Sequence, residues 1–249
     1  MRERYGVSRG GLLYGAVVGA HLASLFVAWV PTGVTKLLIA PALAYAVWRA
    51  AGRLPLLYAG ALLASWVGDY SMWVADDGLS GAYRAYFTAG VVAFGVAHGC
   101  YVWLAVVALA RRRKARGQRA GGRLTAKPVT TALFVASATV AVVVGVPYLL
   151  ALYGLLLAWL VALTGALARH PAAAGGDDVD AGVFAAGAPA GGYGAAFAGA
   201  LAFAVSDGLI GLQLAGALPV GRPWSTALIM GLYAGGQWGL RSLAAGRGR

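Results

Sequence analysis

The chain has 249 residues, of which 60% are hydrophobic and only 11% are charged, whereas soluble domains carry about a quarter of charged residues. Its mean hydropathy of +0.73 excludes an ordinary soluble protein. Its formal net charge of +12 is typical of a protein that binds nucleic acid or of one that lies in a membrane. Because the Lys and Arg residues lie between apolar runs and not on one face, the charge pattern favours a membrane protein.

A transmembrane helix needs about 20 mostly apolar residues, and such runs recur along the whole chain. The first run follows MRERYGVSRG without a small-residue cleavage pattern, so we interpret it as a membrane helix and not as a signal peptide. Pro147 divides two apolar runs that would otherwise form one of about 40 residues. The predicted fold is all-α, a polytopic membrane helix bundle with about eight transmembrane helices. The expected spans are approximately 11–30, 34–50, 54–75, 85–110, 129–146, 148–168, 194–215 and 224–243.

Lys and Arg concentrate in short cytoplasmic loops of membrane proteins, so their positions predict the topology. With both termini in the cytoplasm, all but three of the 20 Lys and Arg residues fall on the cytoplasmic side. The basic stretch 111–127 is predicted to bind anionic lipid head groups, in preference to nucleic acid. Residues 171–192, rich in Ala and Gly with three Asp residues, are predicted to form a flexible cytoplasmic loop.

Two expected helices resemble each other. Residues 62–69 (LLASWVGD) and 200–207 (ALAFAVSD) both place a small residue and then an aspartate late in a helix that runs outward. Four helices separate them, which would give the two halves the same orientation. This pattern suggests a four-plus-four parallel repeat.

Asp69 and Asp207 are the two carboxyls predicted to lie inside the bilayer, each roughly 10 Å from the outer end of its helix. An intramembrane carboxyl is expensive and usually faces a bundle interior. Two nearby carboxyls in a low-dielectric site do not ionise together easily, so they can serve as an acid and a base. The residues leave open which is the acid, and whether the pair instead joins helices or lines an ion path.

Other polar groups on the predicted spans are candidates for supporting this pair. His98 and Tyr101 are three residues apart, and Tyr233 and Gln237 are four apart, so each pair shares one helix face. Lys36 is predicted to lie near the same outer surface, where its ammonium could bind an ionised carboxylate or a phosphate. The remaining His21 and His170, and the single cysteine Cys100, are interpreted as structural residues. No spacing of His and Cys resembles a metal site, and no cofactor motif is found.

Several short motifs, taken in order, resemble the YhhN-like lysoplasmalogenases, which are multi-span membrane hydrolases of bacteria and animals. The motifs are TKLLIAP (35–41), Gly68-Asp69, FTAG (87–90) with Phe94, HGCY (98–101), GALAFAVSD (199–207) and YAGGQ (233–237). The resemblance implies a protein of a bacterial cell membrane that hydrolyses the vinyl ether of a lysophospholipid. It implies that Asp69 and Asp207 are catalytic, and that Lys36, His98, Tyr101, Tyr233 and Gln237 hold the phosphate, the glycerol portion or water. It implies membrane lipid as surroundings and no nucleic-acid partner.

Two other functional classes fit some of these residues. A proton-coupled transporter or channel could use the same Asp and His residues as a relay. The spans show no clear Gly or Pro break at matched positions of the two halves, which is the usual sign of a transport site. A purely structural scaffold leaves the two matched aspartates unexplained.

Overall fold

The computed structural model describes residues 9–27, 30–76, 83–115, 148–169, 193–219 and 222–244. Every regular element in these ranges is a helix, which confirms the all-α prediction there. The predicted span 129–146 and the predicted loop 171–192 lie outside the described residues. The helices are α1 (Arg9–Ser24), α2 (Thr32–Leu37), α3 (Ile39–Ala51), α4 (Leu56–Asp76), α5 (Tyr83–Ala115), α7 (Tyr148–Arg169), α9 (Gly194–Leu214), α10 (Pro223–Leu240) and the short 3₁₀ helix η2 (Arg241–Leu243).

Several of these helices have the length and apolar composition of membrane spans. Among the described residues, four segments meet both conditions: Thr32–Ala51, Tyr83–Lys114, Leu149–Arg169 and Gly194–Leu214. Helix α1 has 16 residues, which is short for a span, and α4, with 21 residues, is not among these four segments. The chain is thus a helical protein with several segments that are long and apolar enough to cross a membrane, and the total of eight spans stays a prediction, as does the parallel repeat.

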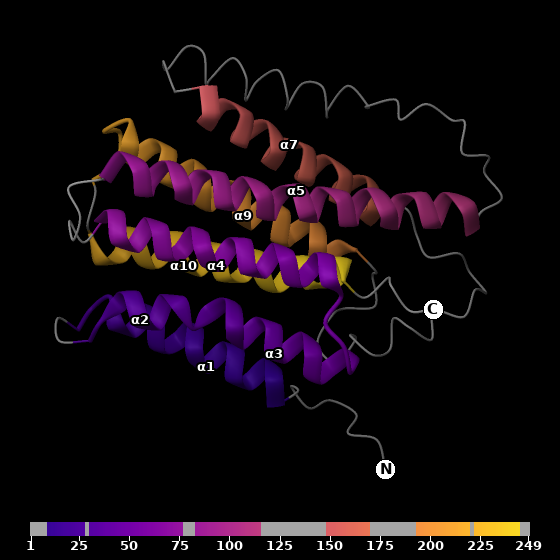
Figure 1. Cartoon of the computed structure of the whole chain (residues 1–249), viewed down its shortest axis with the longest axis horizontal. Coiled ribbons are helices and arrows are strands. Elements are labelled where there is room, and N and C mark those ends of the chain that lie inside the picture. Colours follow the sequence, from indigo (N-terminus) through magenta and orange to yellow (C-terminus); the bar gives the residue numbers. More distant parts are fainter. Residues whose placement is uncertain are drawn as a thin grey trace.

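The helices form a layered bundle whose centre is made by α4, α5, α9 and α10 (Figure 1). Helix α4 packs along α5, and α9 packs along α10. Helices α1, α2 and α3 cover one side of this centre, and α7 covers the opposite side through α5 and α9. Both aspartates therefore lie on central helices, each roughly 10 Å before the last residue of its helix.

The contact between α9 and α10 depends on glycines that bring the two backbones together. A Cβ atom added to Gly239 would lie 2.5 Å from the Ala195 carbonyl oxygen and 2.7 Å from the Gly199 Cα atom. Membrane helices lack a strong hydrophobic drive to associate in lipid, so close backbone approach at small residues is a main source of their packing energy.

Substituting Gly239→Ala should therefore lower the free energy of unfolding by about 1–3 kcal/mol, because the two helices must separate to admit the methyl group. Gly235→Ala is the matched control, since an added Cβ there meets nothing within 4 Å. That control should be neutral or stabilising by up to about 1 kcal/mol, the helix preference of Ala over Gly. Thermal unfolding of the purified protein in detergent measures both, and equal effects of the two substitutions would contradict the contact.

The second predicted span, 34–50, is broken in the structure at Leu38, between α2 and α3. Pro41 in the first turn of α3 has no N–H to donate, so the carbonyl of Leu37 lacks its partner four residues on. The indole nitrogen of Trp66 on α4 donates to that carbonyl at 2.9 Å. The break is thus stabilised by α4, and it leaves Lys36 in the last turn of α2.

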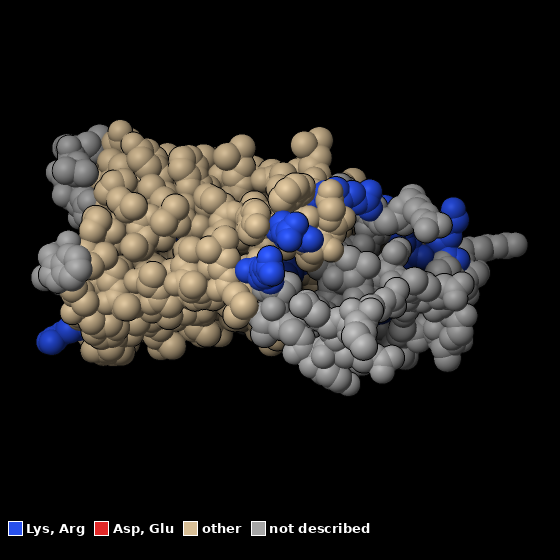
Figure 2. All heavy atoms as spheres, turned by 90° about the horizontal axis from the view of Figure 1, so that it is seen from below, with Lys and Arg blue, Asp and Glu red and all other residues tan. Residues whose placement is uncertain are grey.

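Lys and Arg side chains gather at one end of the bundle, as Figure 2 shows on the face that it displays. At this end Arg112 contacts a neighbouring helix, and Arg241 contacts a ring on α10, the helix that it follows. Arg112 donates to the Leu167 carbonyl at 3.2 Å and lies over the Tyr193 ring, and Arg241 lies 3.4 Å from the Trp238 ring centroid. Long cationic side chains at helix ends place their charge outside the apolar layer. The orientation of the chain in the membrane stays a prediction.

Candidate functional site

Asp69 on α4 is closed inside the bundle, with 1% of its surface exposed. One carboxyl oxygen lies 3.4 Å from the Lys36 ammonium, and the other accepts a hydrogen bond of 2.7 Å from the Tyr233 hydroxyl. Gly68 admits the Phe94 ring beside it, because a Cβ at that position would lie 2.8 Å from the ring. An ion pair and a hydrogen bond together offset the cost of burying an ionised carboxylate.

A second layer of polar side chains holds Tyr233 in place. The Gln237 amide donates to the Ser65 hydroxyl at 2.9 Å, and its oxygen accepts from the Tyr101 hydroxyl at 2.5 Å. The same amide nitrogen lies 3.5 Å from the Tyr233 hydroxyl. Tyr101, Tyr233 and Gln237 thus use their polar atoms on one another and on Asp69. Tyr101 and Gln237 are thus connected to Asp69 through Tyr233.

Asp207 on α9 has a different setting. It is half-buried, and its carboxyl accepts a short hydrogen bond from the Tyr153 hydroxyl of α7. Within the described part of the chain, no cation contacts it, whereas Asp69 has Lys36. The two carboxyls share no hydrogen bond in the described structure. The predicted pair is therefore not a directly bonded dyad in the described structure, and we refer to the surroundings of Asp69 and of Asp207 as the Asp69 arm and the Asp207 arm.

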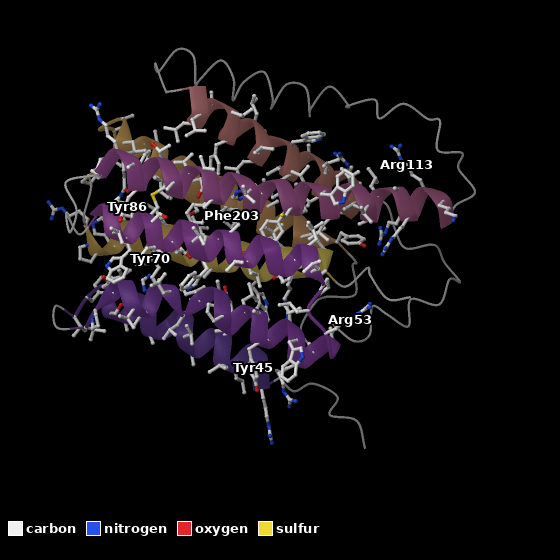
Figure 3. The ribbon with its side chains drawn as sticks, in the orientation of Figure 1. Tyr45, Arg53, Tyr70, Tyr86, Arg113 and Phe203 are labelled. Atoms are coloured by element: carbon white, nitrogen blue, oxygen red, sulfur yellow. The ribbon has the colours of Figure 1, made fainter. Side chains whose placement is uncertain are left out.

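An aromatic cluster joins the two arms. The Phe203 ring, near the middle of the bundle in Figure 3, contacts Tyr233 edge-on at 5.2 Å between centroids and His98 at 4.5 Å. His98 in turn contacts Tyr153, the partner of Asp207, at 5.3 Å. Edge-to-face contacts of this kind fix ring orientation. The rings therefore set the relative placement of the Asp69 arm and the Asp207 arm.

His98 is fully buried and uses only one of its two ring nitrogens. Its Nδ1 atom lies 2.7 Å from the Phe94 carbonyl oxygen, which can only accept. Its Nε2 atom has no hydrogen-bond partner among the described residues. A buried polar atom without a partner is uncommon in native proteins and calls for an explanation.

The structure links the five supporting residues predicted from sequence through hydrogen bonds, an ion pair and ring contacts, and Tyr153, Ser65 and Phe203 take part in the same contacts. Ser65 lies four residues before Asp69 and Phe203 four before Asp207, a helical spacing that could have indicated them. Tyr153 carried no such signal, since it is one hydroxyl in a long apolar run. Its role comes from the packing of α7 against α9.

His21, expected to be structural, is buried on α1 beside the start of α2. Its Nδ1 atom lies 2.9 Å from the Thr35 hydroxyl, which donates to the Thr32 carbonyl at 2.9 Å. His21 therefore fastens α1 to α2, the helix that carries Lys36. Cys100 is half-buried, and His170 lies outside the described residues.

The apolar helices and the buried acidic site together define a class: a polytopic helical membrane protein with a polar site inside the bundle. Comparison with known families goes one step further, because the YhhN family matches residues 32–243, which contain every site residue named above. The chain belongs to the YhhN family. No curated protein and no solved structure matches it.

Proposed function

We propose that the protein is a membrane-embedded hydrolase that cleaves the vinyl ether bond of lysoplasmalogen-like lysolipids to a fatty aldehyde and a glycerophospho-ethanolamine or -choline. The observation that carries the proposal is the unequal setting of the two carboxyls. Asp69 is paired with Lys36, and Asp207 is bound only by a tyrosine hydroxyl in the described structure. An acid and a base that work together need such unequal environments.

The pairing suggests which carboxyl is which. The Lys36 ammonium stabilises Asp69 in its ionised form, so Asp69 is the base. A proton on Asp207 avoids a buried charge without a cation in contact, so Asp207 is the acid. Asp207 is also the more exposed of the two, as a donor to an incoming substrate must be.

The reaction then needs no group beyond these two carboxyls and water. Asp207 protonates the vinyl carbon β to oxygen, and the π electrons of the double bond form the new C–H bond, which leaves an oxocarbenium ion. Water adds to the α carbon while Asp69 accepts its proton, as paired carboxyls do in glycosidases. Asp69 then returns the proton to the ether oxygen as the C–O bond breaks. Asp207 accepts the hemiacetal hydroxyl proton, so both carboxyls regain their starting states.

The surroundings of Lys36 favour an amphiphile as substrate. A cavity of about 310 Å³ lies where α1 ends and α2 begins, one helical turn from Lys36. It is lined by Ser24, Leu25, Val27, Val30, Pro31, Thr32, Gly33 and Trp73. Lys36 keeps 19% of its side chain exposed, so its ammonium can meet a phosphate while it contacts Asp69. A single acyl-like chain would lie between the helices.

The direct test is release of fatty aldehyde from a lysoplasmalogen by the purified protein in detergent. Hydrolysis needs no sealed compartment, so activity in detergent micelles is the expected result. The matched 1-O-alkyl lysolipid, which lacks the vinyl double bond, should not be cleaved because it cannot form the cation by protonation. An inert wild-type protein would overturn the proposal.

A proton-coupled transporter is the second candidate, and one observation favours it. The break between α2 and α3 lies next to Lys36, and discontinuous helices often form transport sites. In the second half, α7 runs unbroken over Tyr148–Arg169, so the break has no counterpart there. Proton-dependent uptake into sealed vesicles, without hydrolysis in detergent, would favour the transporter.

A further inference from the structure

The free ring nitrogen of His98 has a definite chemical character. Because the Phe94 carbonyl can only accept, the Nδ1 atom of His98 must carry the hydrogen. No carboxylate of the described residues contacts the ring, and a cationic imidazole buried without a counter-charge would be costly. The ring is therefore neutral, and Nε2 presents a lone pair. Such an atom can accept a hydrogen bond and cannot donate one.

The position of this lone pair is as specific as its chemistry. His98 lies between the two arms of the site, in contact with Tyr153 on the Asp207 side. On the other side it contacts Phe203, which packs on Tyr233, the partner of Asp69. A substrate that reaches both carboxyls must pass beside the Phe203 and His98 rings, which brings the atoms next to its reacting bond to His98.

We propose that the Nε2 atom of His98 accepts a hydrogen bond from the free sn-2 hydroxyl of the lysolipid, and so makes the site selective for substrates that carry this hydroxyl. The inference rests on the proposed function. In a lysoplasmalogen the vinyl ether oxygen and the sn-2 hydroxyl are on adjacent glycerol carbons. A residue that binds the hydroxyl must therefore lie near the catalytic carboxyls. His98 does.

The other donors of such a lipid fit less well. The sn-2 hydroxyl is the only hydroxyl of the molecule, and a choline head group has no N–H at all. An ethanolamine ammonium lies beyond the phosphate, which Lys36 is suited to hold on the far side of Asp69. A lipid acylated at sn-2 has no donor at this carbon, so binding it would leave the buried acceptor unpaired.

Two synthetic substrates test this directly: a 1-alkenyl lysolipid and its 2-deoxy analogue, which replaces the hydroxyl by hydrogen. A site that binds a hydroxyl rejects the analogue that lacks it, because a buried partner is left unsatisfied. For one neutral acceptor, wild type should prefer the hydroxylated substrate by about 10- to 100-fold in kcat/KM. If Nε2 binds only water, the two substrates will be cleaved at similar efficiency, and the inference fails.

Variants at position 98 assign the preference to the residue. His98→Phe keeps a ring that can pack on Phe203 and Tyr153 but removes the acceptor, so the preference should fall to about 1- to 3-fold. His98→Gln retains a carbonyl oxygen near the Nε2 position and should keep part of the preference. Tyr58→Phe is the matched control: it removes another buried group without a described partner, and it should leave the wild-type ratio unchanged. A His98→Phe protein that keeps the wild-type ratio would overturn the assignment.

Binding measurements separate this inference from the proposed function. The non-cleavable 1-O-alkyl lysolipid and its 2-deoxy analogue can be compared by displacement of a fluorescent lysolipid from wild type and from His98→Gln. If wild type cleaves vinyl ethers but shows no preference for the hydroxyl, the proposed hydrolase function is supported and the proposed role of His98 is wrong. If wild type cleaves nothing yet binds the hydroxylated lipid at least 10-fold more tightly, the hydrolase falls and the role of His98 stands. If wild type neither cleaves nor prefers the hydroxyl, both fall.

Discussion

Replacing Asp207 with Asn should lower kcat for vinyl ether hydrolysis by about 10²- to 10⁴-fold, because the amide cannot donate the proton that forms the oxocarbenium ion. Asn has nearly the same size as Asp, and Asp207 is half-buried, so the fold should be retained. Initial rates of aldehyde release at saturating substrate measure the effect. Thermal unfolding of the same samples checks the fold.

Two further variants show whether the lost group is the proton donor. Tyr153→Phe removes only the hydroxyl that binds Asp207, so it should cost about 10-fold in kcat and leave the acid in place. Asp207→Glu keeps a carboxyl and should retain more activity than Asp207→Asn. A folded Asp207→Asn protein with wild-type kcat would show that another group protonates the substrate.

Replacing Lys36 with Met should destabilise the protein by about 3 kcal/mol, since it leaves the buried Asp69 carboxylate without its cation. We take the lower end of the range for broken buried pairs because Lys36 keeps 19% of its side chain exposed. The double variant Lys36→Met/Asp69→Asn removes both charges and should recover most of the loss. Lys36→Arg keeps the charge and should lose less than Lys36→Met.

Thermal or denaturant unfolding in one detergent at neutral pH provides the comparison among these three variants, the Asp69→Asn single variant and wild type. Recovery in the double variant is the decisive result, because it assigns the loss to an uncompensated charge and not to lost packing of the lysine stem. If the two substitutions simply add, the ion pair contributes little, and Asp69 must be stabilised by Tyr233 and the network behind it.

The separation of the two carboxyls has a chemical advantage. A directly bonded carboxyl pair would share one proton, whereas separated carboxyls with different partners can hold different protonation states at the same time. Phe203 and His98 occupy the connection between the arms, so the spacing depends on their packing.

Much of the fold could be predicted from the order of the residues. Apolar runs of span length define helices in lipid wherever they occur, since an unpaired backbone group in the bilayer costs too much for any irregular chain. Most described helices lie within three residues of the predicted spans. Helix α1 ends six residues before its predicted end, α5 ends five residues after its predicted end, and the second span is broken at Leu38. The sequence shows Pro41, which removes one backbone hydrogen bond from this span. The Trp66 donor that makes the break tolerable lies on another helix, and only the fold brings it there.

The site divides in the same way. Asp69, Asp207, Lys36 and His98 are conspicuous in sequence because ionisable groups are rare in apolar spans. Their partnerships were not readable, since hydrogen bonds such as Tyr101 to Gln237 and Tyr153 to Asp207 join residues on different helices. Helical periodicity reports which side chains share a face of one helix, whereas the rotation and depth of packed helices decide which faces meet. The unequal settings of the two aspartates and the open lone pair of His98 are therefore products of helix packing.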